Sequence, residues 1–92
     1  MQVRWTPAAA DDLENIANYL FEKTPGNAAR LIRYIYGAPA VLKNFPNRGR
    51  AGKKEGTREL LMPSLPYVIV YQVRANIVHI VRILHGSQQW PR

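Results

Sequence analysis

The sequence predicts an α+β fold in which an N-terminal helix hairpin packs on a small antiparallel sheet, with the element order β-α-α-β-β-β. Three observations predict this fold. Apolar residues recur at helical spacing up to residue 45, and they alternate with the two-residue period of strands from residue 57 onward. The chain has 92 residues, enough for one modest core, so we expect residues 1–92 to form a single domain.

Two Thr-Pro pairs, Thr6-Pro7 and Thr24-Pro25, mark the starts of the two helices. Threonine is a good N-cap residue, and proline suits the first helical position because its missing N–H has no helical partner there. Each pair precedes an apolar stripe, which comprises Ala9, Leu13, Ile16, Ala17 and Leu20 in the first helix and Ala28, Leu31, Ile32, Ile35, Ala38, Leu42 and Phe45 in the second. Because almost no loop separates the helices, we expect an antiparallel hairpin whose stripes face one surface.

Two details of the helices also follow from the sequence. Gly37 and Pro39 interrupt the second stripe. Proline removes a backbone hydrogen bond, so we expect a bent second helix rather than two unrelated helices. Asp11 and Asp12 are expected in the first turns of the first helix, where the helix dipole favours negative charge.

The last third of the chain is rich in β-forming residues. Candidate strands are Thr57–Met62, Tyr67–Arg74 and Ile77–Leu84, with a short further strand at Gln2–Trp5. Ala75-Asn76 is a two-residue hairpin turn in which asparagine can adopt positive φ. Residues 47–56 contain three glycines and four positive charges without periodicity, so a mobile basic loop is expected there.

The net charge of +7 is unevenly distributed along the chain. Residues 1–23 carry four acidic side chains against two basic ones, a net charge of −2. Residues 24–92 carry eleven basic side chains against two acidic ones, a net charge of +9. This distribution favours an anionic partner, such as a nucleic acid or an acidic protein segment, without deciding between them.

Several classes of chemistry are excluded or disfavoured. The chain has no cysteine, which excludes disulfides, thiolate nucleophiles and zinc-finger spacings. Gly52-Lys53 lacks the remainder of a phosphate-binding P-loop. If His79 and His85 share a strand, they lie roughly 20 Å apart, too far for one metal ion. We expect no metal and no cofactor. There is no long apolar stretch and no secretion signal, so we expect a cytoplasmic protein that does not bind membranes.

Cations and aromatic residues remain as candidates for function. They are Lys53 and Lys54 in the basic loop, Arg58 at the start of a strand, Arg82 and His85 in the last strand, and Trp90 near the C-terminus. Each has a structural alternative: Arg82 can pair with Glu55 or Glu59, His85 can bond to backbone, and the lysines can simply be solvated. Tyr67 and Tyr71 alternate on one face and are expected to fill the core. We expect Trp90 to fold back on the sheet or to meet a partner.

An ordered set of short motifs resembles the RelE/ParE superfamily of bacterial toxins. The set comprises Trp5-Thr6-Pro7, Ala9-Ala10, Asp12-Leu13, Ile16, Tyr19-Leu20, Phe45-Pro46, Gly49-Arg50, Gly56-Thr57-Arg58-Glu59-Leu60, Tyr67, Tyr71, Ile80 and Arg82-Ile83-Leu84-His85-Gly86. It covers nearly the whole chain in matching order. The C-terminal block through Trp90-Pro91 is most similar to the ParE, plasmid-stabilisation branch.

This resemblance implies a toxin of a type II toxin–antitoxin pair. A cognate antitoxin of the ParD kind would fold an acidic C-terminal segment over the toxin in a hetero-oligomer, and the basic part of this chain suits such a partner. The groove expected for it is lined by Leu13, Ile16, Leu20, Leu31 and Ile35. The residues expected to contact target or antitoxin are Lys53, Lys54, Arg58, Arg82, His85 and Trp90.

The resemblance leaves two modes of action. ParE-like toxins poison DNA gyrase without being enzymes, whereas RelE-like toxins cut mRNA on the ribosome without metal. For the nuclease, the matching residues would be Arg58, Arg82 and, as general acid, His85. Those nucleases carry a tyrosine near the C-terminus, whereas here Gly86 follows His85 and the C-terminal aromatic residue is Trp90; the sequence also offers no convincing general base. We therefore expect a non-enzymatic gyrase poison, with mRNA cleavage as the alternative.

Overall fold

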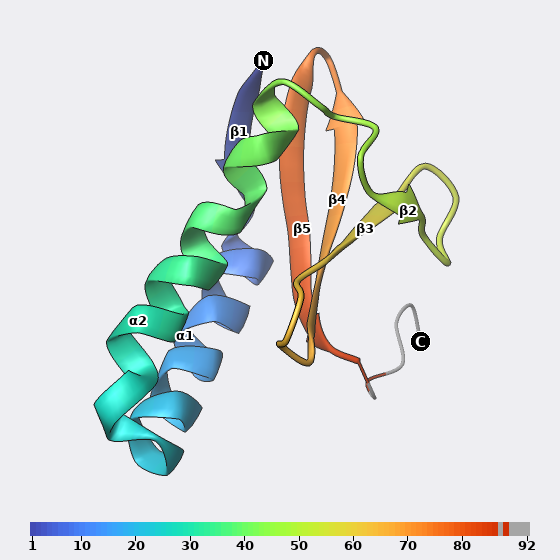
Figure 1. Ribbon diagram of the computed structural model, residues 1–92. Helices are drawn as coiled ribbons and strands as arrows, with labels where there is room; N and C mark the ends of the chain where they lie inside the picture. The colour runs from blue at the N-terminus through green and yellow to red at the C-terminus, as the bar shows by residue number, and fades with distance from the viewer. Residues whose placement is uncertain (87, 89–92) are drawn as a thin grey trace.

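The computed structural model describes residues 1–86 and residue 88 as two helices lying on one face of a five-stranded sheet (Figure 1). The elements in chain order are β1 (Gln2–Trp5), α1 (Pro7–Lys23), α2 (Pro25–Gly37), a 3-10 helix η1 (Ala38–Lys43), β2 (Arg50–Ala51), β3 (Arg58–Leu61), β4 (Tyr67–Arg74) and β5 (Ile77–His85). The strands lie in the order β1-β5-β4-β3-β2. The predicted α+β class and helix hairpin are therefore confirmed.

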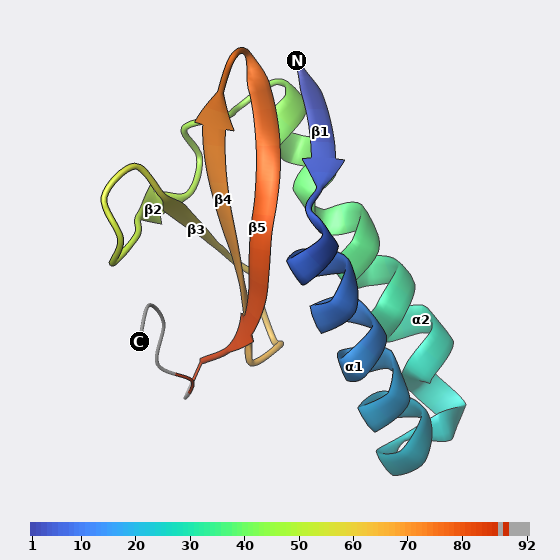
Figure 2. The same ribbon diagram turned by 180° about the vertical axis from the view of Figure 1, so that it is seen from behind.

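The sheet is mixed, so the prediction of an entirely antiparallel sheet is wrong at one edge. β1 pairs with β5 in parallel, with Gln2 opposite Ile77, whereas the other neighbours are antiparallel. Figure 2 shows β1 beside β5 where the chain enters α1. A parallel pair needs a long crossover, and here both helices and three strands intervene between the two paired strands. The pairing of β1 with β5 therefore cannot be predicted from a local turn signal in the sequence.

β2 lies inside the segment that was expected to be a mobile loop. Arg50 and Ala51 pair with Glu59 and Arg58 across an antiparallel ladder. Two residues are too short for an alternation pattern to be visible in the sequence. This pairing places Arg50 in the sheet, opposite the carboxylate-bearing residue Glu59.

The β4–β5 hairpin follows the prediction closely. Ala75 and Asn76 have φ of 53° and 62°, the left-handed pair of a type I′ turn. Farther along, Val70 is opposite Arg82 and Tyr71 is opposite Ile80, so Val81 is the extra residue of a bulge.

Thr6 caps α1 as predicted and also fastens it to the sheet. Its hydroxyl oxygen accepts a hydrogen bond from the Ala9 N–H at 3.2 Å and donates to the Ile80 carbonyl at 2.7 Å. Thr24 makes no side-chain cap for α2; its N–H instead donates to the Leu20 carbonyl and closes α1. Asp11 and Asp12 lie beyond the first turn of α1, so their expected role at the helix dipole is wrong.

The second helix changes its winding at the predicted interruption. α2 ends at Gly37 and runs without a loop into η1, with Pro39 fully buried. The apolar stripe continues through Leu42, which is also fully buried, but Phe45 is 59% exposed and lies outside the core. A 3-10 helix has three residues per turn and this one ends at Lys43, so the 3.6-residue spacing no longer applies at Phe45.

The core lies between the helices and the facing side of the sheet. Its fully buried members include Ile35, Leu42, Ile69, Tyr71, Val78 and Ile80. Of the five residues expected to line an antitoxin groove, Leu20 and Ile35 are buried core residues, and Leu13, Ile16 and Leu31 are partly buried against the core. Leu20 and Ile35 thus belong to the core, whereas Leu13 and Ile16 also line open hollows, so the antitoxin groove stays a prediction.

Candidate functional site at the end of β5

Three hollows meet around Tyr67, His85 and Gly86, where β5 ends beside the β3–β4 connection. Their volumes are about 460, 480 and 50 Å³. The first and third hollows share His85, whereas Leu84, the preceding strand residue, points to the opposite face and lines only the third. We define the β5-end site as the residues that line the first and third of these hollows.

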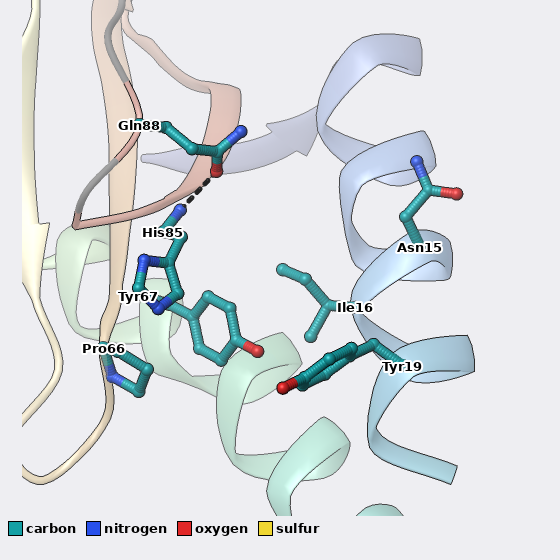
Figure 3. Close-up of a pocket in the computed structure, with 7 residues that line it drawn as sticks. All are labelled: Asn15, Ile16, Tyr19, Pro66, Tyr67, His85 and Gln88. Atoms are coloured by element: carbon teal, nitrogen blue, oxygen red, sulfur yellow. Dashed lines mark hydrogen bonds between the residues drawn. The ribbon is translucent and has the colours of Figure 1, made fainter. Parts of the chain in front are cut away.

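The first hollow lies between α1 and the sheet and is lined by aromatic and amide side chains (Figure 3). Its residues are Asn15, Ile16, Tyr19, Pro66, Tyr67, His85 and Gln88. The rings of Tyr67 and His85 meet edge to face with centroids 6.0 Å apart, and the backbone N–H of His85 donates to the Gln88 side-chain oxygen. Tyr19 is 56% exposed, so this hollow offers an open aromatic surface.

Tyr67 is the buried member of this hollow. Burial, and then the neighbouring Tyr19 hydroxyl, raise the pKa of Tyr67 above its ordinary value of 10.0. Tyr67 therefore keeps its proton at neutral pH. Tyr67 and Tyr71 are both in the core, as predicted.

The third hollow lies on the other face and contains the charged groups Arg50, Lys53 and Glu59 beside Leu84 and His85. Arg50 holds Glu59 through Nε and Nη2, each 2.9 Å from Oε1. Glu59 is only 8% exposed, so its charge is compensated inside the sheet by Arg50. The expectation that Glu59 can serve as the partner of Arg82 is therefore wrong.

Arg82 is paired with Asp12 of α1, a partner that the sequence pattern did not suggest. Nε and Nη2 of Arg82 donate to the two carboxylate oxygens of Asp12 at 2.7 and 2.9 Å. The Ile83 N–H donates to the same carboxylate at 2.9 Å. β1 covers β5 only as far as Ile80, and Asp12 supplies the acceptor that a neighbouring strand would supply beyond that point. This hydrogen bond from Arg82 to Asp12 raises the pKa of Arg82 more than desolvation lowers it.

Arg58 binds two backbone carbonyls. Its Nη1 donates to the carbonyl of Gly49 at 2.7 Å and to that of Asn47 at 3.3 Å. The Tyr71 hydroxyl beside it donates to the Pro46 carbonyl and accepts from the Gly49 N–H, at 2.7 and 2.8 Å. Arg58 and Tyr71 together hold residues 46–49 against the sheet.

The structure does not bring the three candidate nuclease residues together. Arg58 lies opposite Tyr71 and His85 lies opposite Tyr67 on β4. These positions are four residues apart, which is about 13 Å along a strand. Arg82 is occupied by Asp12, so the constellation of a cation, a second cation and a general acid around one phosphate is absent from the described residues.

The remaining candidates fall into two groups. Lys53 lies at the β5-end site with His85, whereas Lys54 is exposed in the β2–β3 loop and its carbonyl accepts from the Thr57 N–H and hydroxyl. Trp90 lies outside the described residues. Within residues 1–86 and 88 no cluster of three potential ligand side chains could hold a metal ion, and no helix is long and apolar enough to cross a membrane.

Sequence reasoning missed Arg50 and Tyr19 of the β5-end site, and also Asp12, the partner of Arg82. Asp12, Arg50 and Tyr19 all belong to the motifs that carry the family resemblance, so that resemblance was the available signal. Their contacts could not be read locally, because Asp12 and Arg82 are 70 residues apart in the chain.

Comparison with known proteins assigns this fold to a family. Residues 3–90 match the model of the ParE toxin of the type II toxin–antitoxin system parDE. The chain is 36% identical over 91 residues to Y4kP, a Sinorhizobium fredii protein named as a toxin, covering 99% of this chain and 94% of that protein. It is 37% identical over 87 residues to Toxin RelE2 of Caulobacter vibrioides, covering 95% and 97%.

A solved structure agrees with these sequence matches. The chain superposes with a TM-score of 0.86 and 26% identity on a chain of the chromosomal ParDE toxin–antitoxin system from P. aeruginosa, covering 92% of this chain and 95% of that one. The helix hairpin and the mixed sheet thus belong to a toxin fold. The chain is a member of the ParE/RelE family of type II toxin–antitoxin toxins, which confirms the resemblance drawn from its motifs.

Proposed function

We propose that this toxin poisons DNA gyrase by binding and is not an RNA-cleaving enzyme. The main support for this proposal is that Arg82 and Arg58 already have hydrogen-bond partners within the protein. Arg82 is paired with Asp12 and Arg58 with two backbone carbonyls. Metal-free RNA cleavage needs catalytic groups positioned on both sides of the scissile phosphate. Arg82 and Arg58 instead stabilise the fold.

The β5-end site supports a binding function. It combines an open aromatic hollow at Tyr19 and Tyr67 with a cation, Lys53, and the Arg50–Glu59 ion pair at the neighbouring hollow. Aromatic and arginine side chains are the ones that most often dominate protein–protein binding energy. We therefore propose this end of the sheet as the surface that meets the target.

We further propose that a cognate antitoxin of the ParD kind neutralises the toxin in the cytoplasm. The excess of positive charge in residues 24–92 favours an acidic segment as the partner. The P. aeruginosa chain with the similar fold comes from such a pair, ParDE. Because Leu20 and Ile35 are buried, these two residues of the predicted groove would not contact that segment directly.

The alternative is ribosome-dependent mRNA cleavage. It is favoured by the relative named Toxin RelE2 and by the proximity of His85 and Lys53 around one hollow. Under this alternative His85 would act as general acid, with Lys53 neutralising the phosphate.

Two parallel assays distinguish these functions. The purified toxin is added to gyrase with supercoiled plasmid, and separately to ribosomes translating a defined message. We expect linearised plasmid trapped in a gyrase complex and an intact message. Cut message with unaffected gyrase would overturn the proposal in favour of the nuclease. Omission of the toxin and addition of Leu60→Asp toxin, which cannot bury its core, serve as controls.

A further inference from the structure

The outer face of the helix hairpin, turned away from the sheet, carries a groove that the proposed function does not use. It lies between α1 and α2, has a volume of about 380 Å³, and is lined by Trp5, Ala10, Leu13, Glu14, Ala17, Ile32 and Tyr36. Tyr36 is 61% exposed and stacks on Trp5 with ring centroids 5.4 Å apart. We call this surface the hairpin face.

The hairpin face is apolar along its centre and carries opposite charges on its two helices. Glu14 of α1 lines the groove, and Arg33 of α2 lies one turn from Tyr36 on the same side of a helix that has no acidic residue. Among the described residues, neither Glu14 nor Arg33 takes part in an ion pair. Each therefore has an unused charge at the surface.

These charges exclude two kinds of partner. A nucleic acid or an acidic peptide would be repelled by α1, because residues 1–23 have a net charge of −2. A uniformly basic partner would be repelled by α2. A partner suited to this face must therefore place basic side chains opposite α1 and acidic side chains opposite α2.

A second copy of this chain meets that requirement. When two hairpins pack face to face about a two-fold axis parallel to the helices, α1 of each lies against α2 of the other at the same height. The hairpin turns at Thr24, and Glu14 precedes it by ten residues while Arg33 follows it by nine. Glu14 of one copy therefore faces Arg33 of the other, twice per dimer. Tyr36, twelve residues after the turn, similarly meets the level of the small residue Ala10.

We propose that the hairpin face is a self-association surface and that two toxin chains form a four-helix dimer through it. The shorter helix, α2, has 13 residues, about 20 Å of rise, and two helices are about 20 Å wide. The contact is thus about 400 Å² per copy, which is small for a stable interface and typical of a weak, reversible one. The dimer leaves the β5-end site on the sheet open.

A charge-swap experiment on the full chain tests this proposal. Sedimentation velocity is measured from about 1 to 300 μM for the wild type, Glu14→Arg, Arg33→Glu and the double swap. We expect a wild-type dimer with Kd in the micromolar range, at least tenfold weaker association of each single variant through like-charge contact, and recovery in the double swap. Glu55→Arg, in the β2–β3 loop, makes the same charge change away from the face and should leave Kd unchanged.

Each outcome of this experiment either supports or overturns the proposed dimer. All substituted side chains are exposed, and circular dichroism checks that each variant is folded. A wild type that stays monomeric throughout, or a dimer indifferent to both single swaps, overturns the proposal. If Glu14→Arg weakens binding of an antitoxin while the toxin alone is monomeric, the face serves the antitoxin and the proposal is wrong. The gyrase assay is independent of this experiment, so failure of either proposal is distinguishable from failure of the other.

Discussion

Asp12 of α1 and Arg82 of β5 form a two-point ion pair at 2.7 and 2.9 Å, and the same carboxylate accepts the Ile83 N–H. Asp12 thus accepts a hydrogen bond from the β5 backbone where β1 no longer pairs with it. The same contact joins the first helix to the last strand. The pair also removes Arg82 from the set of cations available to a phosphate. One structural contact therefore bears on both stability and mechanism.

Asp12→Ala should lower the free energy of unfolding by about 1–3 kcal/mol, because it leaves the Ile83 N–H and the Arg82 guanidinium without their acceptor. Arg82→Ala should cost less, since Asp12 still accepts from Ile83. Urea unfolding measures both. Asp11→Ala, an exposed neighbour on the same helix, is the matched control and should stay within about 0.5 kcal/mol of wild type. An Arg82→Ala loss larger than that of Asp12→Ala would contradict this role of the carboxylate.

Gly49→Ala should destabilise the fold strongly. A Cβ at this position would lie 2.6 Å from Tyr71 Cε1 and 2.9 Å from the Glu59 carbonyl oxygen, and neither the buried ring nor the strand backbone can move away easily. We expect a loss of about 2 kcal/mol or more in thermal or urea unfolding. Gly26→Ala provides the contrast, because its Cβ would meet nothing within 4 Å in α2 and should be neutral or stabilising. Equal effects of the two substitutions would refute the close packing at Gly49.

The raised pKa of Tyr67 predicts that the protein loses stability at alkaline pH. This pKa is raised in the folded state, so folding favours the protonated phenol. The resulting stabilisation is fully present below the ordinary value of 10.0 and is lost as the pH rises through the higher folded-state pKa. Urea midpoints measured from about pH 8 to pH 11.5 should therefore fall less steeply for Tyr67→Phe than for wild type. The exposed Tyr34→Phe should keep the wild-type slope, and an unchanged slope for Tyr67→Phe would argue against burial as the cause.

Tyr19→Ala combined with His85→Ala should reduce toxicity at least tenfold while leaving the unfolding midpoint nearly unchanged, because both side chains are exposed at the proposed target surface. Growth after induction gives toxicity, and urea unfolding gives stability. Phe45→Ala removes a similarly exposed aromatic side chain on a different element and should remain toxic. Undiminished toxicity of the double variant would place the target contact elsewhere.

Much of the helical half could be predicted because its signals are local. The Thr6 cap, the hairpin at Thr24 and the change of winding near Pro39 depend on residues within one or two turns of each other. The Ala75-Asn76 turn is local in the same way. Phe45 was misplaced because the stripe was extended through a 3-10 helix with a different period.

The site was less predictable because its contacts are not local. Lys53 and His85 were recognised from the residue types and do lie around one hollow. Arg58 and Arg82 were recognised as important cations, yet they bind the carbonyl of Gly49 and the carboxylate of Asp12. Residue type alone does not reveal whether a cation is already neutralised.

From the sequence by itself come the order of helices and strands, the start of α1, the tight β4–β5 turn and the family, because short-range periodicity and turn chemistry encode them. The parallel placement of β1, the two-residue β2 and the pairing of Asp12 with Arg82 were decided only by the tertiary structure. Packing of the hairpin against the sheet brings α1 beside the part of β5 that β1 does not cover. The Ile83 N–H and the half-buried Arg82 guanidinium need an acceptor there, and the Asp12 carboxylate of α1 lies within hydrogen-bonding distance of both.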